Sequence, residues 1–248
     1  MTMTGAHLSN VVMQALRLAG YALIFLAGIW FHSSGAMAAM AEYAEDIRYL
    51  TVQHLQLTAI SGALAIVTGI PIGVALARRS LGILGPVVAQ VVNLGTTIPT
   101  LAILALAMTV MGLGTPPAIF GLTVLTLLPI VLNTIAGIKS VPPALIDAAR
   151  GMGMTGWQIL WKVELPYALF VIFAGIRTAL AINIGTVPLA FLIGGGGLGE
   201  LIFTGIDLME PGLLLAGAIP TALLAVAVDL LGAQAQYWLV PKGINPLR

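Results

Sequence analysis

The stretch KSVPPALIDAARGMGMTGWQILWKVELP, residues 139–166, separates two long apolar runs, Pro116–Ile138 and Tyr167–Gly194. An apolar helix of about 20 residues crosses the hydrocarbon core of a bilayer. Both flanking runs are long enough to do so. We therefore predict that residues 139–166 form a polar loop joining two membrane-spanning helices on one face of a membrane.

The whole chain has the composition of a membrane protein, since 59% of its 248 residues are hydrophobic and only 8% are charged. Soluble domains carry about 25% charged residues. Four further stretches qualify as spans: Leu18–His32, Gln53–Ala77, Ile83–Gly112 and Gly212–Leu239. We predict an all-α integral membrane protein of about six transmembrane helices, with a break where Gly95 and Pro99 divide the third span.

The basic residues fall on one side of this predicted bundle. Cytoplasmic loops are enriched in Lys and Arg. If the N-terminus lies inside and all six segments cross, only Arg48 falls on the outer side, and the cytoplasmic side receives Arg17, Arg78, Arg79, Lys139, Arg150, Lys162, Lys242 and Arg248. Both termini are therefore expected in the cytoplasm.

The predicted organisation is an N-terminal anchor helix and external loop over residues 1–51, a transmembrane core over 52–240 that contains the loop 139–166, and a cytoplasmic tail over 241–248. Arg17, the apolar run after it and the small residues Ala36-Met37-Ala38 also fit a cleaved signal peptide. A retained anchor is favoured, because the residues before the apolar run are too many for a typical signal peptide.

Several classes of site are excluded. The chain has no cysteine, three scattered histidines and a net charge of +1, which argues against thiol chemistry, metal binding and nucleic-acid binding. No Walker pattern and no catalytic constellation occurs. We predict no catalytic, cofactor-binding or metal-binding residues, and the chain is not expected to be an enzyme.

Two short helices are predicted within the loop. The first begins at Pro142-Pro143 and ends at Gly151. The second opens with a capping box formed by Thr155 and Gln158 and ends before Pro166. Such a helix pair suits docking in a groove of another protein, but it equally suits lying on a membrane surface. The residues alone leave both alternatives open.

The loop resembles the EAA loop of ABC importer permeases, which has Glu-Ala-Ala, three residues, Gly, and Leu-Pro downstream. Here the motif is Asp147-Ala148-Ala149, with Asp for the usual Glu, then Gly153 and Leu165-Pro166. The resemblance implies a type I (MetI-like) permease fold whose loop is the coupling helix of a separate ATPase subunit, so that ATP is held by the partner and this chain binds no cofactor. The ATPase-coupling residues would be Asp147, Ala148, Ala149, Gly151, Gly153 and Pro166.

Four further stretches resemble the osmoprotectant branch of these permeases, which imports glycine betaine, choline, carnitine and proline betaine: Gly69–Gly73, Leu128–Thr134, Ala174–Ala179 and Ile193–Gly199. This implies a bacterial inner-membrane protein, a second permease subunit, the same or homologous, and an extracytoplasmic binding protein that delivers substrate to the Glu200–Glu210 face. Another ABC permease, for an amino acid or a sulfonate, is the nearest alternative. A secondary transporter is disfavoured because Asp229 is the only carboxylate within the spans.

Polar residues within the spans are the remaining candidates. Arg177 and Asp229 lie at equal depth, roughly 15 Å from the cytoplasmic end, on consecutive antiparallel helices, so an intramembrane ion pair of structural role is predicted. Helix breaks often border transport paths. The possible substrate-path residues are Asn93, Thr97, Asn183 and Thr186, with interhelical hydrogen bonding as the alternative.

Two glycine patterns complete the expectations. The pair Gly69 and Gly73 is predicted to permit close helix contact. The run Gly194–Gly199 is expected to be a flexible external turn.

Overall fold

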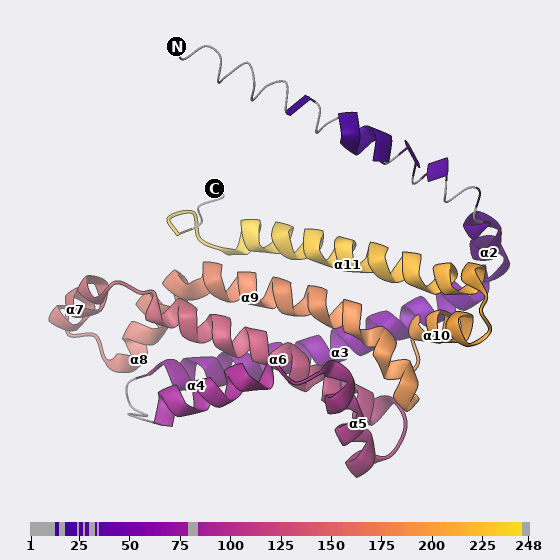
Figure 1. Ribbon diagram of the computed structural model, residues 1–248. Helices are drawn as coiled ribbons and strands as arrows, with labels where there is room; N and C mark the ends of the chain where they lie inside the picture. The colour runs from indigo at the N-terminus through magenta and orange to yellow at the C-terminus, as the bar shows by residue number, and fades with distance from the viewer. Residues whose placement is uncertain are drawn as a thin grey trace, which may run out of the picture.

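The structure is a computed structural model that describes residues 13–14, 18–23, 25–26, 28–29, 33, 35–78 and 84–244. Within these residues every regular element is a helix (Figure 1), which confirms the predicted all-α class. The predicted first span, Leu18–His32, is described only in part, and Arg17, Arg79 and Arg248 lie outside the described residues. Whether that segment is an anchor or a signal peptide stays a prediction.

Four long helices lie side by side and form the body of the molecule: α3 (Ala44–Ala77), α6 (Thr115–Lys139), α9 (Leu165–Thr186) and α11 (Pro211–Leu239) (Figure 1). Each belongs to a segment long and apolar enough to cross a membrane, the third of which extends from Gly156 to Ile193. Four predicted spans are thus confirmed. A short helix, α2 (Ala36–Glu42), precedes α3.

The predicted third span is divided into two short helices, α4 (Leu84–Gly95) and α5 (Thr100–Met111). The predicted break lies between them. The amides of Thr96 and Thr97 bond back to the carbonyls of Asn93 and Leu94, which ends α4, and Pro99 is the residue before α5. Because proline favours an opening turn and has no amide hydrogen, the chain restarts as a helix at this point.

Small residues bring the long helices together. A Cβ atom at Gly73 of α3 would lie 2.5 Å from Cβ of Thr134 on α6, and one at Gly69 would lie 3.1 Å from Cγ2 of Ile130. A Cβ atom at Gly175 of α9 would overlap the side chain of Asn133. Small residues let membrane helices pack closely. The close contact predicted for Gly69 and Gly73 is confirmed.

The bundle has two different ends (Figure 1). At one end lie α7 (Pro143–Gly151) and α8 (Gly156–Ile159). At the other lies α10 (Gly199–Asp207), which follows a 3-10 helix over Val187–Ile193 and the glycine run. The chain topology therefore gathers most basic residues at the α7 end and most acidic residues at the α10 end: Arg78, Lys139, Arg150, Lys162 and Lys242 against Glu42, Glu45, Asp46, Glu200 and Glu210.

The glycine run is a closely packed connection, contrary to the flexible turn expected. Gly194, Gly196 and Gly197 have positive φ angles of 79°, 80° and 87°, which favour glycine. The amide of Gly197 donates to Gln53 Oε1 at 3.1 Å. Gly195 is buried, and a Cβ atom there would lie 2.7 Å from Cβ of Ala118. Sequence composition alone could not reveal these neighbours.

Candidate functional site

Helix α7 presents a small exposed surface at the end of the bundle. Asp147 and Ala148 are exposed, and the side chain of Asp147 is 72% accessible and 3.6 Å from Arg150. Ala149, by contrast, is only 1% exposed. Of the alanine pair expected to contact a partner, one member therefore faces outward and the other packs within the chain itself.

Gly153, rather than Gly151, is the glycine that the backbone requires. Its φ of 77° lies in the left-handed region, just after the end of α7. Its amide donates to the carbonyl of Arg150 at 2.9 Å, and the amide of Met154 donates to that of Ala149 at 3.1 Å. These two bonds form a Schellman motif, which ends a helix at a defined angle. The glycine thus sets the direction in which the chain leaves α7.

The second loop helix begins as predicted but does not end where expected. The capping box of Thr155 and Gln158 is present and opens α8. Instead of stopping before Pro166, the helix continues through a π turn over Leu160–Glu164 directly into α9. Pro166 would clash with a carbonyl one turn earlier in a regular α-helix. The wider π turn, in which the Leu165 amide bonds to the Leu160 carbonyl, accommodates it.

The loop is consequently tied to the spans at three points. Through the π turn it is continuous with α9. Arg78, at the end of α3, donates from Nη2 to the carbonyl of Gly156 at 2.8 Å. Val141 and Ile159 are buried. The loop is therefore positioned by the bundle, so a displacement of α7 would be passed to α9.

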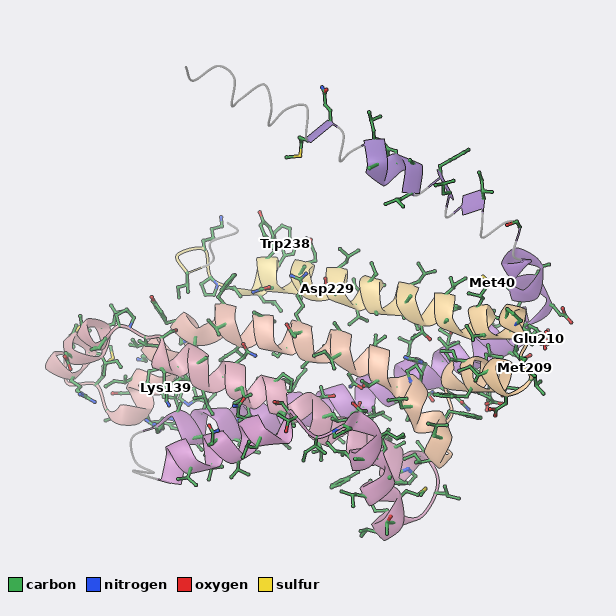
Figure 2. The ribbon with its side chains drawn as sticks, in the orientation of Figure 1. Met40, Lys139, Met209, Glu210, Asp229 and Trp238 are labelled. Atoms are coloured by element: carbon green, nitrogen blue, oxygen red, sulfur yellow. The ribbon has the colours of Figure 1, made fainter. Side chains whose placement is uncertain are left out.

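Arg177 and Asp229 meet between α9 and α11 in the middle of the bundle (Figure 2 labels Asp229). Nε donates to Oδ1 at 2.5 Å and Nη2 to Oδ2 at 2.7 Å, a bidentate arrangement. Seven residues away on both helices, Gln236 Nε2 donates to the carbonyl of Phe170 at 3.0 Å. These three bonds hold α9 and α11 in one antiparallel register, as expected of polar groups between membrane helices.

Asn183 lies in a buried polar cluster between α3 and α9. Its Nδ2 donates to Oγ of Ser61 at 2.8 Å, and Nε2 of His54 lies 3.1 Å from the carbonyl of Ile184. All three side chains are buried. This placement favours the interhelical hydrogen bonding that was the alternative to a substrate path. The spacing of His54, Thr58 and Ser61, which repeats along one face of a helix, is the signal that could have revealed the cluster.

The other possible path residues lie at two helix breaks. Asn93 and Thr97 are exposed at the end of α4, where the hydroxyl of Thr97 donates to the carbonyl of Leu94 at 2.7 Å. The hydroxyl of Thr186 donates to the carbonyl of Asn183 at 2.9 Å, just before the 3-10 helix begins. The structure thus separates the four residues into two groups at different helix breaks. In the part of the chain that the structure describes, no three His, Asp or Glu side chains are placed to hold a metal ion.

Comparisons with known proteins agree on one family. Residues 69–243 match the family described as "Binding-protein-dependent transport system inner membrane component". The osmoprotectant import permease protein OsmY of Salmonella typhimurium is 51% identical over 186 residues, covering 75% of this chain and 79% of that protein. The glycine betaine/carnitine/choline transport system permease protein OpuCB of Bacillus subtilis is 41% identical over 203 residues, covering 82% of this chain and 93% of its own.

A solved structure extends the likeness to the fold. A chain of the MetNI methionine ABC transporter, solved in an inward-facing conformation, matches with a TM-score of 0.71 at 26% identity. The match covers 80% of this chain and 99% of that one.

Proposed function

The chain belongs to the family of binding-protein-dependent transport system inner membrane components, and from this premise we propose that it is the permease subunit of an ATP-driven importer of quaternary ammonium osmoprotectants such as glycine betaine, choline and carnitine. It is a multi-pass inner-membrane protein with several apolar helices. Its two termini would lie in the cytoplasm, as the distribution of Lys and Arg favours.

The observation that carries the proposal is the exposed face of α7 together with its rigid attachment. Figure 1 shows α7 at the extreme end of the bundle. Asp147 and Ala148 are open to a partner, while the Schellman motif, the capping box and the π turn fix α7 relative to α9. We propose that a separate ATPase subunit receives this face and holds the ATP. Its closure would then tilt α9 through a connection without a loose hinge.

A pair of permease chains, each with one ATPase subunit, would form the complete transporter. At the α10 end, the exposed residues of the Glu200–Glu210 stretch include Glu200, Asp207 and Glu210, which form an acidic surface on which an extracytoplasmic binding protein could dock. Quaternary ammonium groups are recognised by aromatic cages. The chain has only 6% aromatic residues, which supports selection of the substrate by that binding protein, with the permease supplying the passage.

The test is reconstitution of the chain in proteoliposomes with an ATPase subunit and a binding protein from the same source. The expected result is ATP-dependent uptake of labelled glycine betaine, choline or carnitine, and none when the ATPase subunit is left out. Uptake that needs a proton gradient but no ATPase would contradict the importer class. ATP-dependent uptake of methionine or a sulfonate, with no quaternary ammonium compound carried, would contradict the substrate class alone.

A further inference from the structure

A cavity of about 750 Å³ opens at the α7 end, between the loop helices and the ends of α3 and α6. Its charged lining comes from several elements and carries both signs. The basic side chains are Arg78, Lys139 and Arg150, and the acidic ones are Asp147 and Glu164. Apolar residues such as Ile138 and Ile159 complete the wall. A site of this kind can hold a ligand that carries both an anionic and a cationic group.

Glu164 determines which kind of cationic group the ligand should carry. Glu164 lines the cavity, and its shielded Oε2 accepts no hydrogen bond within the residues that the structure describes. A carboxylate that lines a cavity favours a ligand group that donates an N–H or O–H bond to it. A primary ammonium donates three such bonds. A quaternary ammonium donates none, so the osmoprotectants proposed above would give this carboxylate no hydrogen bond.

The basic residues define the anionic half. Arg78 is half-buried and, among the residues that the structure describes, its side chain donates only from Nη2, to the Gly156 carbonyl. Its other N–H groups are then available to a ligand. Lys139 lies at the end of α6 (Figure 2), where the helix dipole also favours its charge, and it lines the cavity. Guanidinium and ammonium groups together are the usual partners of phosphate. Basic pockets between membrane helices bind phospholipid head groups in this way.

The loop that lines the cavity carries two exposed tryptophans. Trp157 and Trp161, 64% and 56% exposed, stand on the same loop with their rings in edge-to-face contact at 5.6 Å. Exposed tryptophans concentrate at membrane–water interfaces. We propose that the cavity binds the phosphoethanolamine head group of a membrane phospholipid, with the phosphate at Arg78 and Lys139 and the ammonium at Glu164. A lipid held there would brace α7 against the bundle.

The experiment is lipid retention by the full chain. The protein is incorporated into liposomes containing equal amounts of phosphatidylethanolamine, phosphatidylglycerol and phosphatidylcholine, extracted in mild detergent, and analysed for bound lipid by native mass spectrometry. Phosphatidylcholine carries the same phosphate without an N–H donor. We expect phosphatidylethanolamine to be retained about tenfold over phosphatidylcholine, the ratio that one charge-assisted hydrogen bond can provide.

Substitutions of Glu164 and Lys139 separate the contributions of ammonium binding and phosphate binding to lipid retention. Glu164→Gln should abolish the preference for ethanolamine over choline while phosphate binding remains, and Lys139→Ala should lower retention of all three lipids. Lys162→Ala is the matched control, since Lys162 is exposed on the same π turn and does not belong to the cavity lining. Thermal unfolding of each variant verifies that it is folded.

Four results would overturn the proposal. Equal retention of the ethanolamine and choline lipids, or a preference that survives Glu164→Gln, would remove Glu164 as the ammonium partner. Preferential retention of phosphatidylglycerol would indicate a simple anion site. Binding of soluble phosphoethanolamine to the chain in phosphatidylcholine nanodiscs, with no retention of phosphatidylethanolamine, would assign the cavity to a small cytosolic solute instead of a lipid.

Discussion

Both ends of the bundle contain glycines with positive φ and polar side chains, but these residues are exposed at one end and packed at the other. At the α7 end a glycine with positive φ ends an exposed helix, and charged groups face outward. At the α10 end, glycines with positive φ are packed between helices, and the polar side chains of His54, Ser61 and Asn183 are buried nearby. The α7 end exposes a helix to which we propose that an ATPase subunit binds. The α10 end packs its glycines and buried polar side chains between its own helices.

The comparison predicts that a charge reversal at the α7 end removes transport without harming the fold. Asp147→Lys places a cation on the exposed face that the ATPase subunit is proposed to receive. ATP-driven uptake in proteoliposomes should fall by more than about tenfold, because charge mismatches at interfaces cost several kcal/mol. Membrane insertion and thermal unfolding should stay unchanged.

The control for this prediction is Lys162→Glu, an opposite charge reversal on the same loop. Lys162 is exposed on the π turn and does not belong to α7. If it impairs uptake as strongly as Asp147→Lys, the effect belongs to the charge of the whole loop and not to α7.

At the α10 end the same logic predicts a loss of stability. A Cβ atom at Gly199 would overlap the backbone carbonyl of Pro188, which cannot move aside. Gly199→Ala should lower the free energy of unfolding by about 1–3 kcal/mol, the usual cost of overpacking. Thermal unfolding in detergent measures it.

Gly185→Ala is the matched control, since a Cβ atom there would meet nothing within 4 Å. This substitution should be neutral or slightly stabilising, because alanine favours a helix over glycine. Equal unfolding temperatures for the two variants would contradict the packed arrangement of the glycine run.

The smallest effect is expected at Gly153, where geometry and not packing is the constraint. Its φ is 77°, and a Cβ atom would have open space around it. Gly153→Ala should destabilise the loop by about 1 kcal/mol, from the left-handed backbone alone. Gly153→Asn should recover part of this, because asparagine tolerates that region. Hydrogen exchange at the amides of Gly153 and Met154 measures this local destabilisation. Gly151→Ala is the control: because Gly151 has no positive φ, this substitution should leave the exchange unchanged.

The features encoded in local sequence were predictable. Apolar length gave four long spans, Pro99 marked the break between α4 and α5, and Thr155 with Gln158 marked the start of α8. Those that depend on distant neighbours were not. The contact of Gly195 with Ala118 requires knowing that two remote segments meet. The π turn before Pro166 was missed because an i→i+5 bond leaves no periodic pattern in the residues.

The candidate site divides in the same way. Equal depth on antiparallel helices was enough to predict the Arg177–Asp229 ion pair from the sequence. The burial of Ala149 and the partner of Asn183 were not accessible from sequence, because the face that a short helix turns inward is set by its connections at both ends.

The central claim is that α7 faces the cytosol and is covered by a separate ATPase subunit. Because the chain has no cysteine, a single Ala148→Cys substitution provides a unique thiol on that face. In membrane vesicles of known orientation, a membrane-impermeant maleimide should label it only from the cytosolic side, and the ATPase subunit should block the reaction while leaving Lys242→Cys labelled. Labelling of Ala148→Cys from the outer side, or labelling unaffected by the ATPase subunit, would contradict the account.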